Sequence, residues 1–334
     1  MNLSKLITAT PRNLDSKAVA FDLHLPTFGP EASYGRVEGI AKEAERLGFE
    51  GLWISDHLIN PAPHAHLLFP SARRDLAKDY AILEAWTLAS ALAVACKRAR
   101  IGTYVLCNSF RHPSLVAKMA STLDEISGGR VDLGIGSGWL REEFEAYGIA
   151  WEGYSTRYER LREAVRVLKA LFSGEEVSFE GKYYGLRGAR LVPKPVQRPR
   201  IPIYVGGWSK KMIELAAEEA DGWIPNNLPL KEMEGKVKFL GERAEKAGRE
   251  IEVIYGIDNL IVSKDEGELS KLKRLKFGDL EMDEAKPWIV GKPDECLDKL
   301  LGYVKLGVRR FVIDFADPSP RTLRLFSNDV MNRL

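Results

Sequence analysis

The stretch from Ile101 to Trp139 constrains the fold of this chain more than any other. Ile101 to Cys107 is rich in apolar and β-branched residues, as a buried strand requires. A helix is predicted to start at Pro113, which needs no intrahelical partner for its nitrogen, and to end at Gly128-Gly129. Apolar residues follow at helical spacing: Leu115, Met119, Leu123 and Ile126. Val131 to Ile135 predicts a second buried strand, so the stretch is a parallel βαβ unit.

The same alternation of strand and helix runs through most of the 334 residues. The predicted strands are residues 19–28, 49–55, 99–107, 131–135, 201–205, 221–225, 251–262 and 309–315. Because no linker-like stretch separates two halves, the pattern favours an α/β fold of one (β/α)8 TIM barrel over residues 18–334. A doubly wound sheet stays open as an alternative, since counting strands cannot show that a sheet closes.

Three segments interrupt this rhythm. Residues 1–17 are predicted to be an N-terminal extension. Residues 175–199 have the alternation and turn residues of a hairpin, which indicates an insertion. Residues 264–287 form a charged excursion that fits a helix followed by a loop.

The composition of the chain indicates which kinds of binding partner and which cellular compartment to expect. The 49 basic and 47 acidic residues give a net charge of +2 with no basic run, so nucleic acid is not an expected partner. No stretch has the length and hydrophobicity of a membrane span. The three cysteines lack CxxC spacing, which indicates reduced thiols and a cytoplasmic protein.

Ligands of a barrel bind at the carboxyl ends of its strands. That rule brings a set of residues to one mouth: Thr27, Phe28, Asp56, His57, Tyr104 to Asn108, Gly136 to Trp139, Gly206, Gly207 and Asn226. His57 could exchange a proton with a substrate oxygen, or it could cap local backbone. The glycines of 134–138 and 206–207 could bring N–H groups close to a phosphate, or they could form tight turns. His64 and His66 have HxH spacing without an evident third ligand, so no metal site is predicted.

Four segments resemble the bacterial-luciferase-like superfamily of barrel oxidoreductases, which use FMN or the deazaflavin F420. They are GFEGLWISDH (48–57), the 101–139 stretch, GYSTRYERLREAVRVLKALF (153–172) and PIYVGGWSKKMIELAAEEADGW (202–223). The resemblance implies a luciferase-like TIM barrel and hydride chemistry at the cofactor ring.

The resemblance also implies roles for individual residues. Asp56 and His57 match the pair that faces the ring, and His57 would move a proton while Asp56 fixes its orientation. Tyr104-Val105 falls where the deazaflavin branch has a non-prolyl cis peptide, and the backbone to Cys107 would support the ring. The phosphate would be held by the remaining matched positions: Gly136, Ser137, Gly138, Gly206, Gly207 and Arg157.

This sequence departs from the glucose-6-phosphate dehydrogenases of the superfamily at two places. Pro61 stands where they have a tryptophan, and Trp139 stands where they have a glutamate, so a sugar-phosphate substrate is doubtful. The prediction is therefore an F420-dependent oxidoreductase acting on a small organic molecule, in a homodimer. The alternatives are an FMN-dependent monooxygenase that uses oxygen and a partner flavin reductase, and a barrel that binds flavin or another ligand without turnover.

Overall fold

The computed structural model describes residues 19–29, 32–61, 80–277 and 287–334. Eight parallel strands form its centre: β1 (Ala20–His24), β3 (Gly51–Ile54), β5 (Arg100–Thr103), β7 (Val131–Gly136), β10 (Ile203–Gly206), β11 (Gly222–Ile224), β12 (Glu252–Val262) and β14 (Arg310–Phe315). Each strand pairs with its neighbours in chain order, and β14 pairs with β1 through Ala20 and Arg310. Pairing of β7 with β10, through Leu133 and Ile203, joins the two halves of the sheet. The sheet is therefore closed, and the predicted (β/α)8 barrel is confirmed over the doubly wound alternative.

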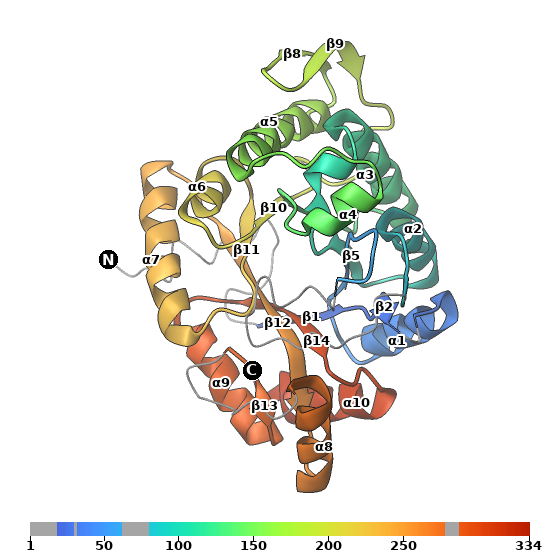
Figure 1. The fold of residues 1–334 in the computed structure, drawn as a ribbon, viewed down its shortest axis with the longest axis vertical. Coiled ribbons are helices and arrows are strands. Elements are labelled where there is room, and N and C mark those ends of the chain that lie inside the picture. The colour runs from blue at the N-terminus through green and yellow to red at the C-terminus, as the bar shows by residue number, and fades with distance from the viewer. Residues whose placement is uncertain (1–18, 30–31, 62–79, 278–286) are drawn as a thin grey trace.

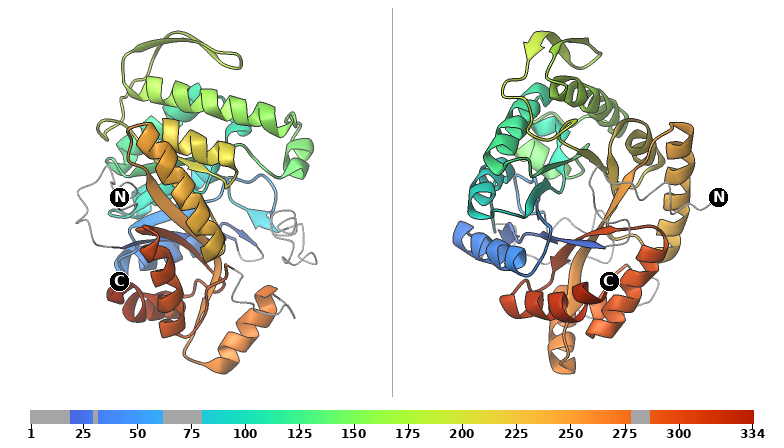
Figure 2. Two further views of the ribbon diagram at one scale, coloured as in Figure 1. Left: turned by 90° about the vertical axis from the view of Figure 1, so that its left-hand side faces the viewer. Right: turned by 180° about the vertical axis from the view of Figure 1, so that it is seen from behind.

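Helices surround the barrel in the described part of the chain (Figure 1). They are α1 (Tyr34–Arg46), α2 (Ala85–Ala95), α3 (Pro113–Ser127), α4 (Arg141–Ala146), α5 (Tyr154–Phe172), α6 (Lys210–Glu219), α7 (Leu230–Lys246), α8 (Glu266–Phe277), α9 (Pro293–Lys305) and α10 (Pro320–Asp329). The short elements are strands β2 (Phe28–Gly29), β4 (Ala81–Ile82), β6 (Leu106–Cys107) and β13 (Val290–Gly291), and 3₁₀ helices η3 (Asn108–Phe110) and η4 (Met331–Arg333). The predicted insertion is a hairpin of β8 (Glu176–Glu180) and β9 (Gly185–Arg190), which stands beyond α5 in both views of Figure 2.

The barrel strands are apolar on both faces because each face has something to cover it. One set of side chains packs outward against the helices, and Leu52 and Ile54 of β3 belong to that layer. The other set fills the barrel interior, where Trp53 packs with Tyr204, Ile224, Ile254 and Val312. This is why the strands were recognisable as apolar runs rather than as alternating ones.

A charged network closes the amino-terminal end of the barrel. The fully buried guanidinium of Arg310 donates to Asp22 at 2.5 Å and to Asp132 at 2.8 Å. Glu252 lies 3.9 Å from the same guanidinium and accepts a hydrogen bond from the Tyr204 hydroxyl. The network thus ties β1, β7, β12 and β14 together at the end opposite the carboxyl ends of the strands.

The structure corrects several predicted boundaries. The strand predicted over 99–107 divides into β5 and β6, and the Tyr104-Val105 peptide bond between them is cis. The apolar residues from Tyr80 to Cys96 predict one helix. The observed helix α2 begins later, at Ala85, because Ala81 pairs with Gly29 and the Glu84 carboxylate caps the helix. Residues 1–17, His64, His66 and the segment 278–286 lie outside the described residues.

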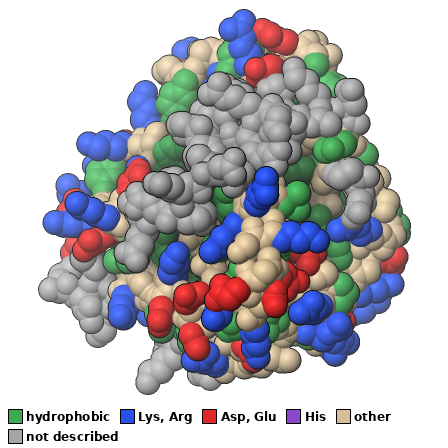
Figure 3. Space-filling view, turned by 60° about the horizontal axis from the view of Figure 1, so that its bottom comes forward, with side chains coloured by type: hydrophobic (Ala, Val, Ile, Leu, Met, Phe, Trp, Pro, Cys, Tyr) green, Lys and Arg blue, Asp and Glu red, His purple; other side chains and the backbone are tan. Residues whose placement is uncertain are grey.

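The apolar stripe predicted for α3 is partly exposed. Leu115 and Ile126 are 52% and 46% exposed, whereas Val116, Ala120 and Leu123 face the core. On the face seen in Figure 3, basic and acidic side chains are interspersed, as expected from the even charge balance. Among the helices described, none has both the length and the apolar character needed to cross a bilayer.

Candidate functional site

A cavity of about 1130 Å³ opens at the carboxyl ends of the barrel strands. Most of the strand-end residues singled out in the sequence line it: Phe28, Asp56, His57, Tyr104 to Cys107, Gly136 to Trp139, Arg157, Gly206, Gly207 and Asn226. Thr27 and Asn108 are buried and lie outside this lining. The volume is large enough for a cofactor together with a small substrate.

His57 is held by a carboxylate that the sequence reasoning missed. Its Nδ1 lies 3.0 Å from an oxygen of Glu143, which is 1% exposed and also accepts from the backbone N–H of Leu58 at 3.1 Å. A carboxylate on Nδ1 fixes the ring orientation and leaves Nε2 for another partner. The rings of Trp139 and His57 meet edge to face, and their centroids are 5.6 Å apart.

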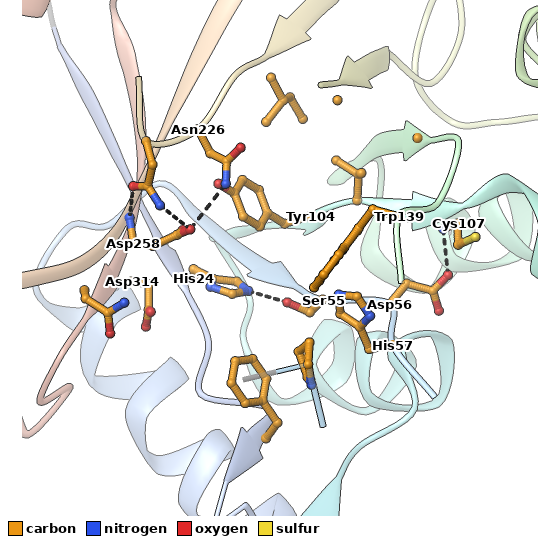
Figure 4. Close-up of a pocket in the computed structure, with 18 of the residues that line it drawn as sticks. His24, Ser55, Asp56, His57, Tyr104, Cys107, Trp139, Asn226, Asp258 and Asp314 are labelled. Carbon is orange, nitrogen blue, oxygen red and sulfur yellow. Dashed lines mark hydrogen bonds between the residues drawn. The ribbon is translucent and has the colours of Figure 1, made fainter. Parts of the chain in front are cut away.

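Asp56 does not have the predicted role. Its carboxylate accepts from the Arg111 guanidinium at 2.8 and 3.0 Å and from the backbone N–H of Cys107 at 2.9 Å (Figure 4). Arg111 in turn bonds Glu84 at 2.7 Å. The expectation that Asp56 orients His57 was therefore wrong: Glu143 contacts the ring, and Asp56 fixes the backbone that follows the cis peptide.

The glycine loops converge on Val105. A Cβ added to Gly136 or to Gly206 would lie 2.9 Å from a methyl of Val105, closer than such contacts occur. Gly138 and Gly207 have φ of +77° and +118°, the region that favours glycine. Gly136 and Gly206 are therefore required because Val105 packs against them, and Gly138 and Gly207 because of their positive φ.

Arg157 lies beside the first of these loops. Its Nε donates to the Ser137 carbonyl at 3.2 Å, and its guanidinium stacks over Trp151 at 3.7 Å. The side chain is 7% exposed and lines the cavity. A fixed cation next to exposed backbone N–H groups is suited to an anion such as a phosphate.

A second polar group lies at the other end of the cavity, formed by β1, β12 and β14. Figure 4 shows Asp258 and Asp314 on one side of His24, and Ser55 on the other. Asp258 accepts from the amide groups of Asn226 and Asn227, at 3.2 and 2.6 Å. Burial, together with the charge of Asp314, raises the pKa of Asp258 to about 7. Neither acid was selected from the sequence, although each lies within a predicted buried strand.

A closed barrel with glycine loops, a cis peptide and a histidine–carboxylate pair around one cavity defines a cofactor-binding barrel enzyme. The family model for luciferase-like monooxygenases matches residues 18–274. The chain belongs to this family, as the resemblance predicted.

Relatives in this family have names that refer to either F420 or FMN. An F420-dependent glucose-6-phosphate dehydrogenase of Kineococcus radiotolerans is 31% identical over 327 residues, covering 89% of this chain and 92% of the relative. An FMNH(2)-dependent dimethylsulfone monooxygenase of Pseudomonas putida is 29% identical over 182 residues, covering 54% of this chain and 49% of the relative. The structure of the F420-dependent tetrahydromethanopterin reductase from Methanopyrus kandleri has the same fold, with a TM-score of 0.76, 23% identity, and coverage of 95% of this chain and 99% of that one.

Proposed function

We propose that the protein is an F420-dependent oxidoreductase that acts on a small organic substrate. The observation that carries the proposal is that the His57–Glu143 pair, the Val105 side chain and two glycine loops line one cavity. The relatives named for F420 align over nearly the whole chain, whereas the FMNH(2)-dependent relative aligns over about half of it. This difference in coverage favours F420 over FMN.

The residues present fit such a cofactor. Because Gly136 and Gly206 lack a Cβ, the Val105 side chain packs directly against them. A flat ring would lie on the cavity side of Val105, along the backbone that follows Tyr104. The N–H groups near Ser137 and Gly138, together with Gly207 and Arg157, would hold the phosphate. The backbone from Tyr104 to Cys107 would support the ring, anchored by Asp56. When bound, F420 supplies a site that donates or accepts a hydride.

His57 would move the proton that accompanies hydride transfer. With Nδ1 bonded to Glu143, its Nε2 would give a proton to a substrate oxygen or take one from it. Glu143 would stabilise the imidazole in the orientation that this transfer needs. Trp139 would cover one side of the imidazole and help to exclude water.

Titration of the purified protein with F420 and with FMN tests the cofactor. We expect F420 to bind at least about tenfold more tightly than FMN. Preferential binding of FMN, with oxygen consumed when reduced FMN is supplied, would instead support the monooxygenase and its flavin reductase partner. Binding of neither cofactor would contradict both enzyme assignments, and binding of F420 without turnover of any substrate would support the non-catalytic barrel.

Substitution of Gly136 by alanine is expected to weaken F420 binding by about tenfold or more. The new Cβ would lie 2.9 Å from Val105 and push that side chain toward the ring position. Gly235→Ala is the matched control, because Gly235 is exposed on α7 and a Cβ there meets nothing within 4 Å. Equal F420 affinity in the two variants would show that the glycine loop does not contact the cofactor.

We also infer a cytoplasmic homodimer. The three cysteines are free and buried, which suits a reducing compartment. Leu115, Met119, Thr122 and Ile126 follow at helical spacing on one side of α3, and Leu115 and Ile126 are about half exposed. Exposed apolar side chains in such a row are typical of an interface between subunits.

Leu115→Glu is expected to convert the homodimer to a monomer, because a carboxylate in an apolar interface is costly to desolvate. Sedimentation velocity measures the result. The control is Leu275→Glu, since Leu275 is 58% exposed on α8, away from α3. A wild-type protein that sediments as a monomer, or a Leu115→Glu variant that stays dimeric, would contradict this interface.

A further inference from the structure

The end of the cavity formed by β1, β12 and β14 has hydrogen-bonding capacity that the protein itself does not use. His24 is only 6% exposed, and its Nε2 lies 2.7 Å from the Ser55 hydroxyl. Its Nδ1 is buried and has no hydrogen-bond partner among the described residues, although His24 lines the cavity. The ring of Tyr104 lies beside that of His24, with the two ring centroids 4.9 Å apart. The Tyr104 hydroxyl is also buried and has no hydrogen-bond partner among the described residues. Buried polar atoms normally find partners, so these two indicate a missing ligand.

The charge at this end is negative. Asp258 and Asp314 both line the cavity beside His24, as Figure 4 shows. In the described part of the chain, the charges that shift the pKa of His24, Tyr104 and Asp258 come from these two aspartates and His57. Among the residues described, three cations also line the cavity: Arg36 on α1, Arg157 on α5 and Lys276 on α8, where it precedes Phe277. The two aspartates outnumber the one lysine next to this end.

The groups present are suited to a hydroxyl rather than to a phosphate. Burial lowers the pKa of His24, so its imidazole is neutral and offers one donor or one acceptor at Nδ1. The phenol of Tyr104 can donate or accept, and the aspartates accept from a hydroxyl. A phosphate monoester carries between one and two negative charges at pH 7, and the charge of Asp314 together with the ionised fraction of Asp258 would repel it.

We propose that His24, Tyr104, Asp258 and Asp314 form the substrate subsite and that it binds the hydroxyl groups of an unphosphorylated alcohol. This inference rests on the proposed function, because it concerns the substrate of the same cavity. Phe277, Trp288 and Phe315 line this end as well, so the alcohol would carry an apolar or ring-shaped body. The substrate would therefore differ from the sugar phosphate for which the F420-dependent relatives are named.

The subsite is tested by measuring, with calorimetry, the affinity of the protein for two alcohols and for the phosphate ester of each. The pairs are cyclohexanol with cyclohexyl phosphate, and glucose with glucose 6-phosphate. The protein is saturated with F420, and each pair differs only by the phosphate. We expect at least one alcohol to bind about tenfold or more tightly than its phosphate ester. In the Asp258→Asn, Asp314→Asn double variant this preference is expected to fall below about threefold, because the repulsion of the ester is removed.

Asp298→Asn is the control, since Asp298 is exposed on α9, and it should keep the wild-type preference. The subsite is contradicted if neither alcohol binds about tenfold or more tightly than its own ester, or if the preference survives in the double variant. Titration of F420 into the same protein preparations, before they are saturated, separates the two proposals. Loss of F420 binding by the wild-type protein would overturn the proposed function, whereas normal F420 binding without alcohol binding would overturn only the subsite.

Discussion

Replacing Arg310 by methionine is expected to lower the free energy of unfolding by about 3–5 kcal/mol, the usual cost of removing one partner from a buried ion pair. The guanidinium is 2% exposed and contacts Asp22 and Asp132, with Glu252 3.9 Å away. Methionine has a similar length, so the variant removes the charge while filling much of the space. Three buried carboxylates would then lose their shared cation, and among the described residues Arg100 would still bond Asp132 at 2.6 Å. Thermal and urea unfolding measure the loss.

The control for this variant is Arg190→Met, which removes an arginine from an exposed ion pair instead of a buried one. Arg190 bonds Glu176 at 2.9 Å on the β8–β9 hairpin, and both side chains are more than half exposed. Exposed pairs of this kind contribute little to stability. If Arg310→Met unfolds at the same urea concentration as Arg190→Met, the network does not stabilise the barrel.

Replacing His57 by alanine is expected to lower kcat by about 10²–10⁴-fold, the range that a positioned acid or base contributes. Binding of F420 should change little, because the residues proposed to hold the phosphate lie on other loops. Glu143→Gln should have a smaller effect, since an amide oxygen can still accept from Nδ1 but carries no charge. Steady-state kinetics with the alcohol that binds in calorimetry, paired with F420 titration, measures both quantities.

His112→Ala is the matched control for His57→Ala. His112 caps the amino terminus of α3, where Nδ1 bonds the hydroxyl and the backbone N–H of Ser114, and it does not line the cavity. Its removal should leave kcat unchanged. A His57→Ala variant with the activity of His112→Ala would remove the proton-transfer role.

The barrel was predictable because apolar residues are spaced differently in its strands and in its helices. Strands covered on both faces are apolar runs, and the helices between them begin and end at recognisable residues such as Pro113 and Gly128. Closure was not predictable, because the β7–β10 pairing depends on geometry rather than on any local pattern. The cis peptide at Tyr104-Val105 came from the family resemblance and is confirmed.

The site was only partly predictable. Glycines and the Asp56-His57 pair stand at strand ends, where the barrel rule selects them. Glu143 is 86 residues from His57 in the chain and lies among other acids on a short helix. Only its position could have identified it, because Glu143 is buried next to Phe144 on α4. Asp258 and Asp314 carried a comparable signal, since each lies inside a barrel strand, where a charged side chain is rare without a partner or a function.

The Arg310 network also has a consequence for engineering this protein. It ties β1, β7, β12 and β14 together at one end of the barrel, while the cavity occupies the other end. Randomised libraries at the carboxyl ends of β12 and β14 therefore change residues that do not take part in this strand anchoring. Changes of substrate preference should be selectable there without a prior round of stabilising mutations.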